Sequence, residues 1–269
     1  MRVTYLTIAV VATAASAYGW GTFLSSFPCP AGSQFPNGLG YRDGRLYLAT
    51  NTTNDPVVWQ LQPKTGSVLA SHPAPALSVM GCTAGIAGET VSYWVASSYT
   101  DYIYQVGYLS GSVVNSFPAP GPHPFGLAFR NQTTMYHTDY GERRLYVLNP
   151  ATGSIYSTEP LDFRPCDVAY DARGFLWIAD GNDRLVWQCD TTGSTISSFS
   201  VAAYGLCSGI AYYNKAVWVG ITVPLHSVLK FEVDPAYAVE PSSIGKVKAL
   251  FRSFTVFVFK EGRPEGGFF

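Results

Sequence analysis

The chain has 269 residues, of which 47% are hydrophobic, 15% aromatic and 13% charged, and its formal net charge is −1. The charged fraction is about half of the usual ~25%, and a nearly neutral chain lacks the basic face that binding to nucleic acid or anionic lipid requires. The many aromatic residues, with 26 Gly and 18 Pro, favour strands joined by tight turns. We therefore expect an all-β protein that does not bind nucleic acid.

The first seventeen residues have the pattern of a secretory signal peptide. Arg2 precedes an apolar run from Tyr5 to Ala14, which is too short to span a bilayer, and Ala15-Ser16-Ala17 fits a cleavage site. We expect a secreted or periplasmic mature chain without a transmembrane helix. The alternative is that these residues form a buried N-terminal strand.

A short motif then recurs at intervals of about 40–50 residues, which is typical of a β-propeller. It predicts the first strand of each blade, and a second and third strand, a turn with Gly and a fourth strand follow it. The five copies are Gly38-Leu39-Gly40-Tyr41, Gly85-Ile86-Ala87-Gly88, Gly126-Leu127-Ala128-Phe129, Asp167-Val168-Ala169-Tyr170 and Gly209-Ile210-Ala211-Tyr212.

The fifth unit lacks a fourth strand after Val233, and a matching segment lies at the other end of the chain. Residues 21–28 align with residues 111–118, so we expect an N-terminal strand to complete the last blade and close the ring. The predicted fold is a propeller of five four-stranded blades over residues 18–235. A sixth blade that draws on the tail, residues 236–269, is the alternative.

Residues 165–199 resemble an NHL repeat, through Gly174-Phe175-Leu176-Trp177-Ile178-Ala179-Asp180 and Asn182-Asp183-Arg184-Leu185. The chain also resembles secreted propellers of the YncE type, in the six-bladed TolB-like superfamily. The resemblance implies the architecture. It does not imply one activity, because the superfamily includes ligand binders, protein scaffolds, lyases and lactonases.

Polar side chains are predicted to gather at one face of the ring. The loops that enter the first strands share this face with the loops between second and third strands. A ring of carboxylates there could bind a polar ligand or a cation such as Ca²⁺; otherwise each Asp accepts hydrogen bonds in its own turn, and no cofactor is expected. The candidate ligand-binding residues are Asn37, His123, Asp139, Asp167 and Asp180.

The function predicted from these residues is a non-enzymatic module that binds an extracellular protein or polysaccharide through the loops of this face. The alternative is a metal-dependent hydrolase or lyase, similar to lactonases or streptogramin lyases, with its site at the same channel mouth. We assign no catalytic residue, because the sequence contains no nucleophile-elbow, zinc-protease or phosphate-loop motif.

Five cysteines in an exported chain allow at most two disulfides. Cys166 and Cys207 precede the first strands of adjacent blades and could form one bridge. Cys29 and Cys82 fall in loops of the same face and could form a second, whereas Cys189 occupies a core position. The alternative is that all of them are free thiols.

Overall fold

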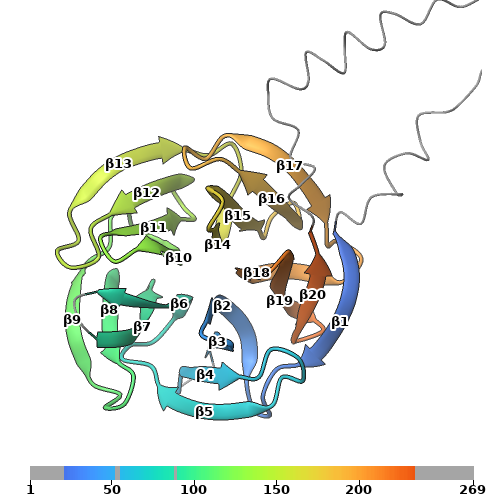
Figure 1. Ribbon diagram of the computed structural model, residues 1–269, viewed down its shortest axis with the longest axis horizontal. Coiled ribbons are helices and arrows are strands. Elements are labelled where there is room, and N and C mark those ends of the chain that lie inside the picture. Colours follow the sequence, from blue (N-terminus) through green and yellow to red (C-terminus); the bar gives the residue numbers. More distant parts are fainter. Residues whose placement is uncertain (1–20, 52–54, 88–89, 234–269) are drawn as a thin grey trace, which may run out of the picture. The chain divides into compact units, whose positions relative to one another are not determined.

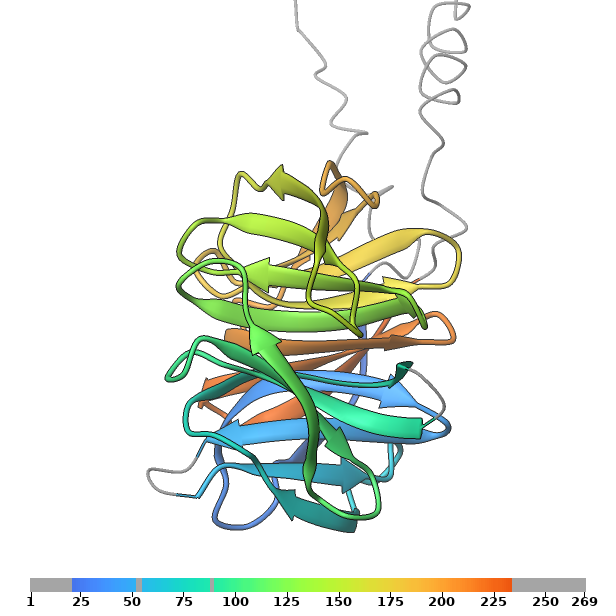
Figure 2. The same cartoon turned by 90° about the vertical axis from the view of Figure 1, so that its left-hand side faces the viewer.

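The computed structural model describes residues 21–51, 55–87 and 90–233. In these residues five antiparallel sheets of four strands are arranged in a ring, and no helix is present (Figures 1 and 2). The fold is a five-bladed β-propeller, as the repeat predicts, and the six-bladed alternative is wrong. The predicted signal peptide and the tail lie outside the described residues. None of the described residues belongs to a helix that could cross a bilayer.

In each blade the first strand lies nearest the centre of the ring and the fourth on its perimeter (Figure 1). The first blade contains β2 (Gln34–Arg42), β3 (Arg45–Asn51), β4 (Val57–Leu61) and β5 (Val68–Pro73). The second contains β6 (Val79–Ala87), β7 (Thr90–Ser97), β8 (Tyr102–Gly107) and β9 (Val113–Pro118). The third contains β10 (Pro124–Asn131), β11 (Thr134–Asp139), β12 (Arg144–Leu148) and β13 (Ile155–Pro160). The fourth contains β14 (Pro165–Asp171), β15 (Phe175–Asp180), β16 (Leu185–Cys189) and β17 (Thr195–Ser200).

The fifth blade joins the two ends of the described chain. Its strands are β18 (Gly205–Tyr213), β19 (Ala216–Pro224), β20 (Ser227–Glu232) and β1 (Thr22–Pro28). β1 pairs antiparallel with β20, with Thr22 opposite Glu232 and Pro28 opposite Ser227. The predicted closure of the ring by the N-terminal strand is therefore confirmed.

Hydrophobic packing holds adjacent blades together. The buried apolar residues of the described chain form five clusters, one at each interface between neighbouring blades. Side chains alternate between the two faces of each sheet, so one strand contributes to two interfaces: Tyr47 of β3 faces the second blade and Leu48 faces the fifth. Each blade thus needs both neighbours to cover its apolar side chains.

The second blade differs from the prediction in its register. The sequence motif aligns residues 85–88 with residues 38–41, but the strand pairing places residues 81–84 there, with Thr83 opposite Trp94. A side chain at Gly81 would collide with the carbonyl oxygen of Phe125 in the next blade, so the second blade requires glycine at this position. The predicted first-strand motif of this blade is wrong by four residues.

Candidate functional site

The connections between strands define two faces of the ring. The face that we call the loop face carries the connections that enter the first strands and those between second and third strands. The opposite one, the turn face, carries the turns between first and second and between third and fourth strands. Asn37, His123, Asp139 and Asp180 lie towards the loop face, and Asp167 lies inside the ring on β14.

Asp139 and Asp180 are fully buried, and each stabilises the turn that follows its own strand. The carboxylate of Asp139 accepts hydrogen bonds of 2.7 Å from the backbone amides of His123 and Glu142. The carboxylate of Asp180 accepts bonds from the amides of Asn182 and Asp183 and, at 3.3 Å, from the indole of Trp187. The structure therefore places both carboxylates in structural roles and leaves neither exposed to a ligand.

His123 contacts Asp139 through its backbone amide, whereas Asn37 lies apart from both aspartates. Asn37 is buried, and its side-chain amide donates to the carbonyl oxygen of Val79 at 3.3 Å. Only His123, among the five predicted residues, exposes its side chain to solvent. In the described part of the chain, no three His, Cys, Asp or Glu side chains come together as a group that could hold a metal ion.

Asp167 occupies the centre of the propeller. Its side chain is fully buried, and one oxygen, Oδ2, accepts hydrogen bonds of 2.9 Å from the amides of Leu39 and Ile210. The other, Oδ1, accepts a bond from the amide of Val168, and the amide of Leu127 also donates to the carboxylate. These four donors come from the first strands of four blades, so a single carboxylate links most of the ring.

This arrangement follows from the position of the first strands at the end of each sheet. Their inner edge has no neighbouring strand, and buried N–H groups on that edge need an acceptor. Asp167 provides it, at a position where the other four blades have Gly38, Gly81, Gly126 and Gly209. An acidic residue in a column of glycines is the sequence signal that identifies this role. Burial raises the pKa of the Asp167 carboxyl well above its usual range, and the amide bonds oppose that shift.

A second buried titratable side chain, His137, lies in β11 of the third blade. Burial lowers the pKa of its imidazole to about 4, and Nδ1 lies 3.0 Å from the carbonyl oxygen of Gly126. The corresponding residues of the other blades are Leu48, Val95, Ile178 and Val219, all aliphatic.

We expect this histidine to make the protein sensitive to acid. Between pH 6.5 and pH 4 the unfolded chain binds a proton that the buried imidazole does not, so the free energy of unfolding should fall by about 3 kcal/mol as the pH is lowered through this range. Urea unfolding at several pH values measures this loss. His137→Leu, which resembles the other blades, should flatten the dependence; an unchanged slope would show that another group is responsible.

All five cysteines are free thiols, so neither predicted disulfide is formed. Cys29 packs at the interface of the fifth and first blades, whereas Cys82 lies in the cluster between the first and second, so their predicted pairing is wrong. Cys166 and Cys207 share one cluster, but the Cys207 thiol donates to the carbonyl oxygen of Asp180 at 3.1 Å. Burial raises the pKa of Cys166 to about 12, which keeps this thiol unreactive.

Two concave regions lined by described residues lie elsewhere, and the sequence does not predict them. A groove of about 370 Å³ on the loop face is formed between the fourth and fifth blades. Its lining residues are Arg184, Ala202, Ala203, Tyr204, Gly205, Leu206, Val223, Pro224 and Leu225. Leu206, Val223 and Leu225 are 37%, 44% and 46% exposed, so the groove presents aliphatic side chains to solvent.

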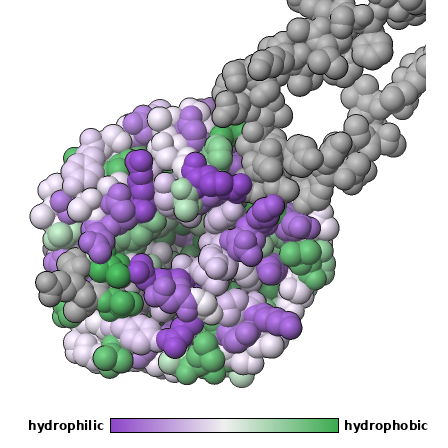
Figure 3. Space-filling view, in the orientation of Figure 1, coloured by the Kyte–Doolittle hydropathy of each residue, from purple (hydrophilic) through white to green (hydrophobic). Residues whose placement is uncertain are grey.

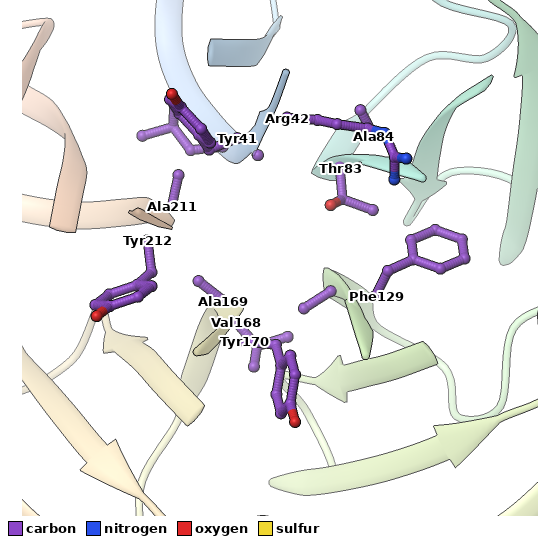
Figure 4. A pocket seen from close by; sticks show the side chains of 13 residues that line it. Tyr41, Arg42, Thr83, Ala84, Phe129, Val168, Ala169, Tyr170, Ala211 and Tyr212 are labelled. Atoms are coloured by element: carbon purple, nitrogen blue, oxygen red, sulfur yellow. The ribbon is translucent and has the colours of Figure 1, made fainter. Parts of the chain in front are cut away.

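The second region, which we call the central pit, has a volume of about 130 Å³ and lies where the channel opens on the turn face. The ring is hollowed at its centre, with polar residues around the hollow (Figure 3). Tyr41, Phe129, Tyr170 and Tyr212 surround the pit, one from each of four blades (Figure 4). The second blade has Ala84 at this position, and the side chain of Arg42 extends towards it (Figure 4).

No protein-family model matches the chain, and no curated protein matches its sequence. Solved structures share its fold. Glutaminyl cyclase from Myxococcus xanthus superposes with a TM-score of 0.57 at 13% identity, over 79% of this chain and 97% of that chain. Virginiamycin B lyase from Staphylococcus aureus has a TM-score of 0.47 at 14% identity, over 80% and 75% of the two chains. At 13% identity, the similarity to the glutaminyl cyclase structure extends to the fold alone.

Proposed function

We propose that this propeller is an exported, non-enzymatic binding module that holds an apolar segment of an extracellular protein in the groove of the loop face. The observation that carries the proposal is the set of exposed aliphatic side chains in a concave surface, Leu206, Val223 and Leu225. Contiguous apolar surface of this kind marks sites of protein interaction, because its removal from water favours association.

The surroundings of the groove fit such a site. The ring of Phe35, 42% exposed, lies 6.1 Å from the ring of His226, which follows Leu225 directly, so the apolar surface continues towards the first blade. Tyr204 is held in place by stacking on Phe23, with 5.6 Å between the ring centroids. Arg184 adds a charged group to the lining. An apolar centre with a polar margin is the usual anatomy of an interface.

Aliphatic side chains favour a protein partner over a polysaccharide, which would be recognised mainly by hydrogen bonds and aromatic stacking. Export, NHL-type kinship and the identity of the partner remain predictions from the sequence.

The alternative, a metal-dependent hydrolase or lyase, needs carboxylates that are free to bind a metal. Both oxygens of Asp139 and both oxygens of Asp180 accept hydrogen bonds from the surrounding chain, so no feature of the described residues favours that alternative.

A random peptide library displayed on phage tests the proposal. We expect the protein to select peptides rich in apolar residues, and Leu206→Ser with Val223→Ser to weaken their binding at least tenfold. Leu109→Ser is the matched control, because Leu109 is 93% exposed but lies in a turn of the opposite face. Selected peptides that bind the double variant as tightly as the parent would contradict the groove assignment, and so would exclusive selection of ligands from a polysaccharide array.

A further inference from the structure

The carboxylate of Asp167 lies close to the inner end of the central pit. Leu39 and Val168 are among its lining residues, and the amides of both donate to Asp167. Asp167 therefore lies beneath the pit, on the side away from the turn face. A ligand would enter from the side opposite to the proposed protein-binding groove.

The wall of the pit repeats the arrangement that holds Asp167. In an antiparallel ladder, residues two apart direct their N–H groups to the same edge of the strand. The amide of Leu39 points into the channel, so the amide of Tyr41 does so as well, about 6.8 Å nearer the opening. The regular pairing of the other first strands places four equivalent amides beside it, those of Ala84, Phe129, Tyr170 and Tyr212.

Positive charge gathers around the opening. The described turns between first and second strands carry the cations Arg42, Arg45, Arg130, Arg173 and Lys215, against the anions Asp43 and Asp171. Arg42 lies nearest the pit, where it extends across the place that Ala84 leaves open (Figure 4). Its only described ion pair is with the exposed Asp43, at 3.2 Å, and a pair of this kind is weak and exchangeable. A cationic rim around a concave site attracts anions.

We propose that the central pit binds a small carboxylate anion, held by the ring of amides at residues 41, 84, 129, 170 and 212 and by the guanidinium of Arg42. A second set of amides, beneath the pit, shows that this geometry accommodates a carboxylate. These are the amides of Leu39, Leu127, Val168 and Ile210, which bind the carboxylate of Asp167. A cavity of about 150 Å³ holds a benzene-sized molecule, so a pit of 130 Å³ suits an acid of about six non-hydrogen atoms or fewer.

The charge of Asp167 does not prevent a carboxylate anion from binding in the pit. Two carboxylates at this separation would repel one another if both were ionised. Four backbone amides bind the carboxylate of Asp167 and offset part of its negative charge beneath the pit. Each bound anion would also receive charge-assisted hydrogen bonds from Arg42, which are stronger than those between neutral groups.

Titration of the ¹⁵N-labelled protein with sodium acetate, at constant ionic strength, tests the site. We expect saturable shifts of the amide resonances of residues 41, 84, 129, 170 and 212, and none with acetamide, which has the same shape without the charge. Arg42→Gln should raise the Kd at least tenfold. Asp43→Asn, which releases Arg42, should lower it, and Lys64→Gln, in an exposed turn of the perimeter, should leave it unchanged.

Equal shifts with acetamide, no saturable shifts, or an unchanged Kd in Arg42→Gln would overturn the proposal. The groove variant with Leu206→Ser and Val223→Ser should keep its affinity for acetate, so failure of the protein-binding proposal and failure of this one are distinguishable.

Discussion

A chain that begins at Cys29, and so lacks β1, is expected to lose the cooperative unfolding transition of the parent protein. β1 supplies the fourth strand of the fifth blade, and without it the whole edge of β20 is unpaired. Phe27 is buried in the cluster between the fifth and first blades, and loss of such a side chain costs about 3–5 kcal/mol by itself. The ladder and the stacking of Phe23 on Tyr204 are lost as well. Together these losses approach the entire stability of a typical domain, about 5–15 kcal/mol.

Circular dichroism during heating or urea unfolding measures this effect. A chain that begins at Gly21 is the control, and it should unfold like the full-length protein. Addition of a synthetic peptide of residues 21–28 to the truncated chain should restore part of the transition, because the peptide can pair with the free edge of β20. A truncated chain that melts at the parent temperature would show that β1 does not close the ring.

The second large effect is expected for Asp167. Asp167→Gly gives the fourth blade the residue that the other four have, but it leaves the amides of Leu39, Leu127, Val168 and Ile210 without their acceptor. An unsatisfied buried donor costs about 1–3 kcal/mol, and water entering from the pit will serve some of them. We expect a total loss of about 4 kcal/mol in the free energy of unfolding.

Urea unfolding of this variant should be compared with that of Asp183→Ala, which removes an exposed carboxylate and should change the stability by less than about 0.5 kcal/mol. If Asp167→Gly is as stable as the parent protein, the carboxylate does not hold the first strands together. The central amides would then not depend on a carboxylate, and the pit above them would have no bound carboxylate as a parallel.

The sequence predicts the architecture well because each blade has the same steric requirements, and residues that meet them recur at the same positions of the repeat. Small residues recur where first strands crowd together, and the match between residues 21–28 and 111–118 predicts the closure of the ring. The error in the second blade arose because Gly85-Ile86-Ala87 resembles the motif while Gly81 satisfies the steric requirement. Spacing alone cannot distinguish two glycines four residues apart on one strand.

The candidate site was harder to predict. An Asp that follows a strand has the same sequence appearance whether it binds a ligand or its own turn, and burial decides between the two for Asp139 and Asp180. The anion-binding groups proposed for the central pit are backbone amides, which every sequence possesses. Two residues near the pit differ from the equivalent residues of the other four blades. Asp167 stands where the others have glycine, and Ala84 stands where the others have an aromatic residue.

The closure of the ring also determines the order in which the protein can be completed. β1 leaves the ribosome first, but its partner β20 is synthesised about 200 residues later, and at ~5–20 residues per second this takes about 10–40 seconds. Throughout this interval Phe23 and Phe27 lack their native partners on β20, Phe231 and Val228. The first strand of the nascent chain therefore stays unpaired until the last blade emerges, and the ring closes only when synthesis of that blade is complete.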